Sequence, residues 1–138
     1  MHIPTPGSPA LGGVATAALI GLAACMPRTE PEVSGRALYA ENCAVCHGDG
    51  GRGDGPAAAG LTPPPTDLTR LTASHDGSFP LVMVMSYIDG YTRPDETMPE
   101  FGEILTGPTV MVDTGDGILT PTPAPLLALA EYLETLQR

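Results

Sequence analysis

The chain has 138 residues, enough for one small domain, and only 4 % of them are aromatic, so a bulky apolar group would help to complete the core. The net charge of −10, with six arginines and no lysine, argues against nucleic-acid binding, because phosphate recognition needs a basic face. With 17 glycines and 16 prolines, much of the chain is expected to be loop.

The first 24 residues are typical of an export signal. Residues 11–24, LGGVATAALIGLAA, are small or apolar and uncharged, but they are fewer than the roughly 20 residues that span a bilayer. The next residue, Cys25, completes LAAC, which resembles the lipobox of bacterial lipoproteins, where this cysteine is lipidated. The n-region lacks Lys and Arg, so an ordinary cleaved signal or an uncleaved anchor is the alternative. We predict a signal peptide over 1–24 and export to the periplasmic side of the membrane, with Cys25 as the lipid anchor.

A tether and a helix are expected next. Residues 25–33 would comprise the lipidated cysteine and the Pro-rich linker MPRTEPEV, and residues 34–138 would form the folded domain. A helix is predicted over residues 34–46, because Ser34 is a good N-cap and the following segment is Ala-rich and lacks proline.

The motif CAVCH, at residues 43–47, has four possible interpretations: a zinc site, a redox dithiol, a simple disulfide and a haem attachment site. A zinc site would need two more Cys or His ligands, and few remain in the domain. A redox dithiol would need a parallel βαβ setting, which the sequence does not indicate. A simple disulfide would leave the adjacent histidine unexplained.

Covalent haem explains this spacing best. Cysteines at i and i+3 face the same way on one helical turn, so their sulfurs can reach the two vinyl groups on one porphyrin edge. His47 then brings its imidazole to the iron, and the sequence C-x-x-C-H is the attachment motif of haem c. The export segment supports this reading, because such attachment occurs outside the cytoplasm. We therefore predict one covalent haem c held by Cys43 and Cys46, with His47 as the proximal iron ligand.

After the motif, residues 48–68 are too rich in Gly and Pro for regular structure. Apolar residues at i, i+3, i+4 and i+7, starting from Leu81, then favour a helix over a strand. Ser78 is the expected N-cap of this helix, Pro80 suits its first turn, and Gly90 suits its end.

The second iron ligand has several candidates in the domain, namely His75, Met83, Met85, Met98 and Met111. His75 is interpreted as a solvated turn residue, and the paired methionines and Met111 are interpreted as core residues. Met98 lies instead in a loop, where Pro99 restricts the backbone and would hold the sulfur in place. Met98 is therefore the predicted distal ligand, with Met111 as the alternative.

The last third of the domain contains two predicted elements. Residues 109–119, TVMVDTGDGIL, predict a small hairpin or an irregular excursion. The final helix should begin at Thr122 as its N-cap, and leucines recur from Leu126 at i+3, i+7 and i+10.

Four segments resemble class I, monohaem cytochromes c of bacteria: YAENCAVCHGDGGRGDG, LTPPPTDL, TMPEFG and an aromatic, Tyr132, in the last helix. The likeness covers residues 35–138. It implies a small, mainly α fold with much irregular loop, in which crossed N- and C-terminal helices surround one haem. In this arrangement Gly35 and Tyr39 would meet Tyr132.

The resemblance also implies how the haem is held. Cys43 and Cys46 would form thioethers, and His47 and Met98 would be the proximal and distal ligands. A backbone carbonyl from residues 63–65 would accept the Nδ1–H of His47. The excursion over 107–121 departs from the family pattern and keeps Met111 open as a ligand.

The predicted function is electron transfer between redox proteins, without substrate chemistry, so the chain would be a carrier and not an enzyme. Its acidic surface favours partners with basic docking sites. The alternatives are a haem subunit of a larger oxidoreductase and a haem-based gas-binding or sensor module.

Overall fold

The computed structural model describes residues 2, 33–92, 97–115 and 117–138. Apart from residue 2, the predicted signal peptide lies outside the described residues, and so do Cys25 and nearly all of the tether. None of the helices over the described residues has the length and apolar character that a membrane crossing requires.

The first predicted helix is present, but it is divided in two. Helix α1 spans Gly35–Asn42 and α2 spans Ala44–His47, with Cys43 between them at φ −116°. The Ser34 hydroxyl accepts a hydrogen bond from the Ala37 amide at 3.2 Å, which confirms the predicted N-cap. The division occurs where the side chain of Asn42 donates to the Leu38 carbonyl at 2.9 Å and competes with the helical amide for that acceptor.

Residues 48–67 form the predicted loop, which contains neither helix nor strand, and a single 3₁₀ turn, η1, follows at Leu68–Arg70. Helix α3 then spans Leu81–Asp89, so the prediction of a helix here is confirmed. Gly90 ends it in the left-handed region at φ 103°, a conformation that glycine adopts at little cost. The prediction that Ser78 caps α3 is wrong, because Pro80 occupies the N-cap position and makes no side-chain bond.

The excursion is a hairpin. Strand β1, Thr109–Asp113, pairs antiparallel with β2, Leu119–Pro123, and Met111 lies opposite Pro121. Thr122 belongs to β2, where its hydroxyl donates to the Thr120 carbonyl at 3.2 Å. The prediction that Thr122 caps the last helix is therefore wrong, because the strand runs directly into that helix.

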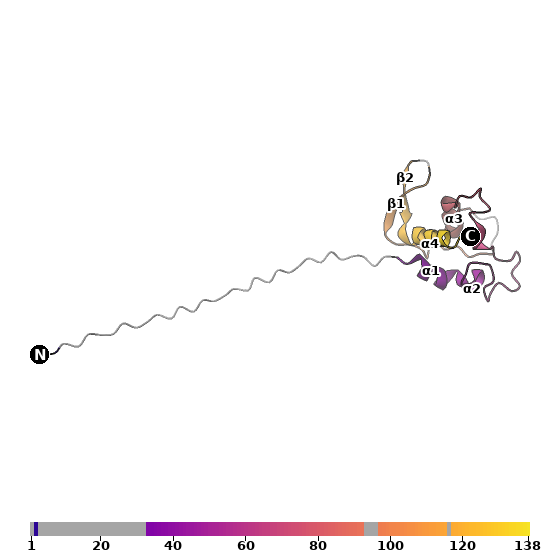
Figure 1. Cartoon of the computed structure of the whole chain (residues 1–138), viewed down its shortest axis with the longest axis horizontal. Coiled ribbons are helices and arrows are strands. Elements are labelled where there is room, and N and C mark those ends of the chain that lie inside the picture. The colour runs from indigo at the N-terminus through magenta and orange to yellow at the C-terminus, as the bar shows by residue number, and fades with distance from the viewer. Residues whose placement is uncertain (1, 3–32, 93–96, 116) are drawn as a thin grey trace. The chain divides into compact units, whose positions relative to one another are not determined.

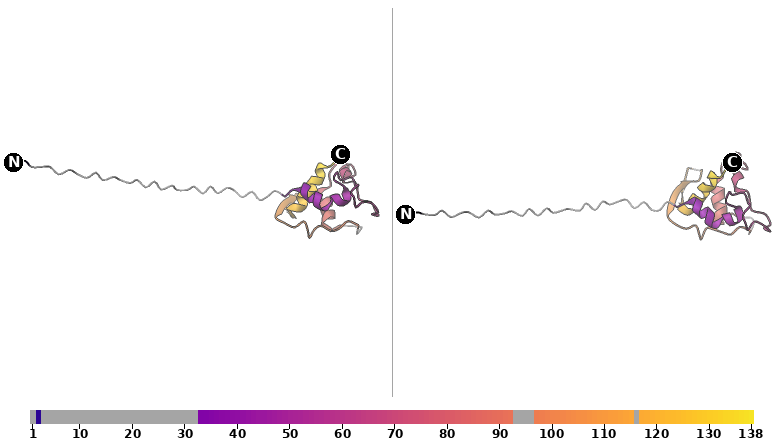
Figure 2. Two further views of the ribbon diagram at one scale, coloured as in Figure 1. Left: turned by 90° about the horizontal axis from the view of Figure 1, so that it is seen from below. Right: turned by 60° about the horizontal axis from the view of Figure 1, so that its bottom comes forward.

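Helix α4, Ala124–Thr135, contacts α1, α3 and β2 and so organises the core. Figure 1 shows α1 and α2 along one side of α4. Both views in Figure 2 place the hairpin at one end of the domain, and α2 and the loop after it at the other. The most deeply buried large side chains come from α1, the segment after α3, and α4: Tyr39, Leu105 and Leu129. The architecture is thus mainly helical, with one small two-stranded sheet among the described residues.

The contact between α1 and α4 is unusually close at Gly35. A side-chain carbon at this position would overlap the backbone carbonyl of Ala128 and lie 2.9 Å from Cβ of Tyr132. One helical turn further on, the rings of Tyr39 and Tyr132 meet with their centroids 5.4 Å apart. The expected meeting of Gly35 and Tyr39 with Tyr132 is therefore observed.

Candidate functional site

A largely apolar cavity of about 340 Å³ opens beside the CAVCH motif. Its walls come from α2, from residues 61–68, from α3 and from the segment 97–101. This volume lies within the range typical of small-molecule and cofactor sites. The predicted site residues that line it are Cys43, Cys46, His47 and Met98.

The two cysteines of the motif are free thiols in the structure, so the alternative of a disulfide between them is not observed. Cys43 is buried, and this burial, together with the neighbouring Cys46, raises the pKa of its thiol to about 11. A catalytic dithiol instead needs a cysteine with a lowered pKa. Within the described residues, no three His, Cys, Asp or Glu side chains are grouped as a metal ion would require. These observations argue against both the dithiol and the zinc interpretations.

His47 is buried at the end of α2, and its Nδ1 lies 3.0 Å from the carbonyl oxygen of Thr66. Burial lowers the pKa of the imidazole, while the bond to Thr66 acts in the opposite direction. The ring is therefore neutral at physiological pH, and the carbonyl assigns the proton to Nδ1. Nε2 then carries a lone pair and has no hydrogen-bond partner among the described residues, which suits it to bind a metal.

The carbonyl that meets His47 comes one residue later than predicted. Residues 63–65 line the cavity with their rings, but the carbonyl of Pro65 lies against Gly53, where a side-chain carbon could not fit. The next carbonyl, that of Thr66, points to the imidazole instead. Alternate carbonyls of an extended segment face opposite ways, which explains the difference of one residue.

Among the candidates for a second ligand, Met98 lies in the cavity wall and packs against the core. Met111 lies on β1 with 56 % of its surface exposed and does not line the cavity, so its interpretation as a core residue is wrong. His75 also lies outside the cavity lining, and its Nδ1 is 2.7 Å from the Leu71 carbonyl in a turn. Of the three, only Met98 shares a cavity with His47.

The other two methionines differ from each other. Met85 is buried in the core, as predicted, whereas Met83 is 42 % exposed and lines the cavity. Helical periodicity places both methionines on α3, but it does not show which of them faces the cavity. Tyr87, also on α3, lines the same cavity and is not among the residues predicted from the sequence.

These residues fit covalent haem. Two thiols lie one helical turn apart at an apolar cavity, a neutral imidazole presents an unpaired nitrogen, and a thioether lies in the wall of the same space. Thioether attachment would use both thiols, so the buried Cys43 would no longer have to ionise. The apolar walls would cover a porphyrin, and the porphyrin would fill core volume for which the chain has few aromatic side chains.

Comparison with known proteins gives the same result at the level of the family. The family model described as "Cytochrome c" matches residues 33–137, about three quarters of the chain, and this range includes every helix and strand found in the described residues. No match was found among curated proteins or among solved structures. The chain therefore belongs to the cytochrome c family, whose members carry electrons on an iron-containing, covalently bound haem c.

Proposed function

We propose that this protein transfers electrons through one haem c, attached to Cys43 and Cys46 and ligated by His47 and Met98. The observation that carries this proposal is that all four side chains line a single apolar cavity. The close contact of α1 with α4 supports the further proposal that the terminal helices cross beside the haem, as the resemblance implies.

When bound, haem supplies a one-electron Fe(III)/Fe(II) couple. The chain's own residues set the conditions for that couple. The Thr66 carbonyl holds His47 in one tautomer, which would leave Nε2 free to bind the iron. The Met98 thioether is neutral and soft and favours ferrous iron, and the apolar walls disfavour the extra charge of the ferric state. If His47 and Met98 both bind the iron, electron transfer would need no exchange of ligands and no substrate.

Replacing Met98 tests the proposal directly. In the haem-loaded protein, Met98→Ala should abolish the ferric absorption band of a sulfur–iron bond. It should also lower the midpoint potential by on the order of 0.1 V, a part of the roughly 0.8 V range that axial ligands control. Both quantities are measured by spectroelectrochemical titration.

Met111→Ala is the matched control, because it removes the same side chain from the exposed face of the hairpin. It should leave the band and the potential as they are in the wild type. If Met98→Ala keeps both, Met98 is not the distal ligand. A wild-type protein that lacks the band and binds carbon monoxide rapidly would instead be a gas-binding module.

We also propose that the protein is exported and is held at the outer face of the cytoplasmic membrane by a lipid on Cys25. Eight linker residues, each spanning at most about 3.5 Å, would then keep the domain within roughly 28 Å of its anchor. Cys25→Ser should move the protein from the membrane fraction to the soluble fraction after cell breakage. If this variant stays as tightly membrane-bound as the wild type, the lipid anchor is refuted.

A further inference from the structure

The two residues at positions 137 and 138, after α4, hold the segment that carries the Thr66 carbonyl. The Gln137 side chain donates through Nε2 to the carbonyls of Leu68, at 2.8 Å, and Leu133, at 2.7 Å. Its Oε1 accepts from the amide of Thr72 at 2.9 Å. One amide side chain thus joins the last turn of α4 to both sides of η1.

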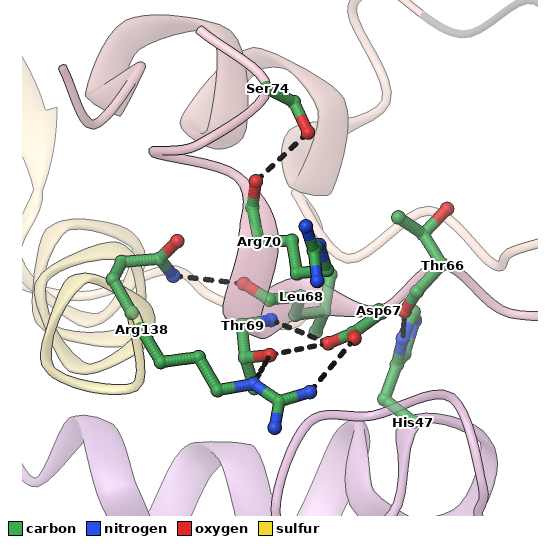
Figure 3. Close-up of polar contacts among 9 residues, drawn as sticks. His47, Thr66, Asp67, Leu68, Thr69, Arg70, Ser74 and Arg138 are labelled. Atoms are coloured by element: carbon green, nitrogen blue, oxygen red, sulfur yellow. Dashed lines mark hydrogen bonds and ion pairs between the residues drawn. The ribbon is translucent and has the colours of Figure 1, made fainter. Parts of the chain in front are cut away.

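Arg138 holds the same segment at three points. Its backbone amide donates to the Thr69 carbonyl at 3.1 Å, and its Nε donates to the Thr69 hydroxyl at 2.7 Å. Its Nη2 lies 3.2 Å from Oδ2 of Asp67, as Figure 3 shows. The ion pair is half exposed and contributes little by itself. The bond to Thr69 is different, because that residue is only 3 % exposed.

The Thr69 hydroxyl connects these contacts to the residue next to Thr66. It donates to Oδ1 of Asp67 at 2.6 Å, and the Thr69 amide donates to the same oxygen at 3.0 Å. Thr66 itself has an exposed side chain that makes no hydrogen bond among the described residues. The position of its carbonyl therefore depends on how Asp67 and the residues after it are held, and Figure 3 shows this chain of contacts leading to His47.

We propose that Gln137 and Arg138, which we name the 137–138 clamp, are positioning residues that set the strength of the hydrogen bond from His47 to Thr66. The inference rests on the proposed function, in which His47 binds the haem iron. A hydrogen bond accepted from Nδ1–H makes the imidazole a more basic ligand, which favours ferric iron and lowers the midpoint potential. Loosening the clamp should therefore raise the potential.

The test uses the full-length, haem-loaded protein with Arg138→Gln and, separately, Gln137→Ala. Gln137→Ala, which changes no charge, should raise the midpoint potential, and Arg138→Gln should give a higher potential than Arg70→Gln, which loses the same charge. Both clamp variants should also speed the exchange of the His47 Nδ1 proton with solvent several-fold, as measured by NMR of the ferrous protein. Arg138→Lys keeps the charge but loses the forked donor geometry, so it should raise the potential as well.

Arg70→Gln is the matched control. Arg70 lies in η1, is exposed, and its guanidinium makes no hydrogen bond or ion pair among the described residues. Removing its charge leaves the clamp intact and, by electrostatics alone, favours ferric iron and lowers the potential. Loss of a charge and loss of the clamp thus change the midpoint potential in opposite directions. A general loss of stability would not produce this difference in direction.

The clamp is refuted if the folded variants lower the potential as the control does, or leave both the potential and the proton exchange unchanged. Should either variant fail to fold, Thr69→Val removes only the connecting hydroxyl and should give the same rise. A wild-type protein whose spectrum shows no histidine-ligated iron would refute the proposed function itself, and the clamp with it.

Discussion

Tyr39 is almost completely buried, and its hydroxyl donates to the carbonyl of Gly48 at 2.6 Å, immediately after His47. Replacing it with phenylalanine keeps the ring contact with α4 but removes one of the two hydrogen bonds that this buried carbonyl accepts, the other coming from the Gly51 amide at 3.1 Å. We expect Tyr39→Phe to lower the free energy of unfolding by about 1–2 kcal/mol at neutral pH, as measured by denaturant titration. Tyr91→Phe is the control, because Tyr91 is 85 % exposed and should show no change.

The same residue predicts a loss of stability in alkali. Burial, with smaller contributions from nearby acidic groups, raises the pKa of Tyr39 from 10.0 to about 12. Between these values the unfolded chain has released the proton and the folded protein has not, so stability falls as pH rises from about 10 to 12 and then levels off. The shift corresponds to roughly 2–3 kcal/mol. If Tyr39→Phe loses as much stability as the wild type over this interval, another group is responsible.

At the residue scale, the functional roles of reactive side chains could be predicted from the sequence, but the roles of individual backbone groups could not. Cys43, Cys46 and His47 are recognisable because their spacing matches the geometry of one cofactor. The Thr66 carbonyl has no sequence signal, since every residue carries a carbonyl, and the packing of the segment, including Pro65 against Gly53, selects it. The contacts of Gln137 and Arg138 span about 70 positions of the chain, and no local pattern indicates them.

At the scale of elements, the junction of α1 with α4 depends on the missing side chain of Gly35. An added methyl group would lie 2.6 Å from the carbonyl carbon of Ala128, which is backbone and cannot move aside alone. We expect Gly35→Ala to lower the free energy of unfolding by about 3 kcal/mol, despite the better helix propensity of alanine. Thermal and denaturant unfolding would measure this loss.

Gly50→Ala provides the comparison, because the nearest atom to the added carbon, Nε of Arg52, lies 3.9 Å away. This control should be within about 0.5 kcal/mol of the wild type. Equal stabilities of the Gly35 and Gly50 variants would show that α1 and α4 can separate at no cost.

The presence of a helix could be predicted from the sequence more reliably than the residue at which the helix begins. The periodicity from Leu81 identifies α3 correctly, because a buried stripe needs apolar side chains at that spacing. Ser78 and Thr122 have the right chemistry for caps, yet a proline stands at the N-cap position of each helix, Pro80 and Pro123. Capping preferences describe a helix that follows a free loop, and α4 instead follows a strand without a break.

At the scale of the whole molecule, the net charge of −10 bears on how partners are met. We expect electron transfer to a basic redox protein to slow by about tenfold or more as ionic strength rises from ~0.01 to ~0.15 M, because salt screens the attraction. Stopped-flow kinetics would measure this rate. A neutral small-molecule reductant should show no such dependence, and a rate to the basic protein that is flat or rises with salt would contradict a basic docking site.

The CAVCH motif and the family resemblance of the segments around it predict the overall architecture better than hydrophobic periodicity does. Residues 48–67 have no repeating pattern, and they help to enclose a cavity that a cofactor would fill in place of a larger core. The hairpin is the part that departs from the family pattern, and its place away from α2 became visible only in three dimensions.

The hairpin also limits how copies of this protein can associate. Proline has no amide hydrogen, so the hydrogen bonds between the two strands must form at the pairs Val110–Thr122 and Val112–Thr120. The backbone nitrogens of Pro121 and Pro123 therefore face the outer edge of β2. Of the three outward positions of β2, only Leu119 keeps an amide donor for an added strand, whereas the outer edge of β1 keeps all of its own. A second copy would therefore pair more readily with β1 than with β2. Contact through the hairpin would favour a pair over a continuing fibre.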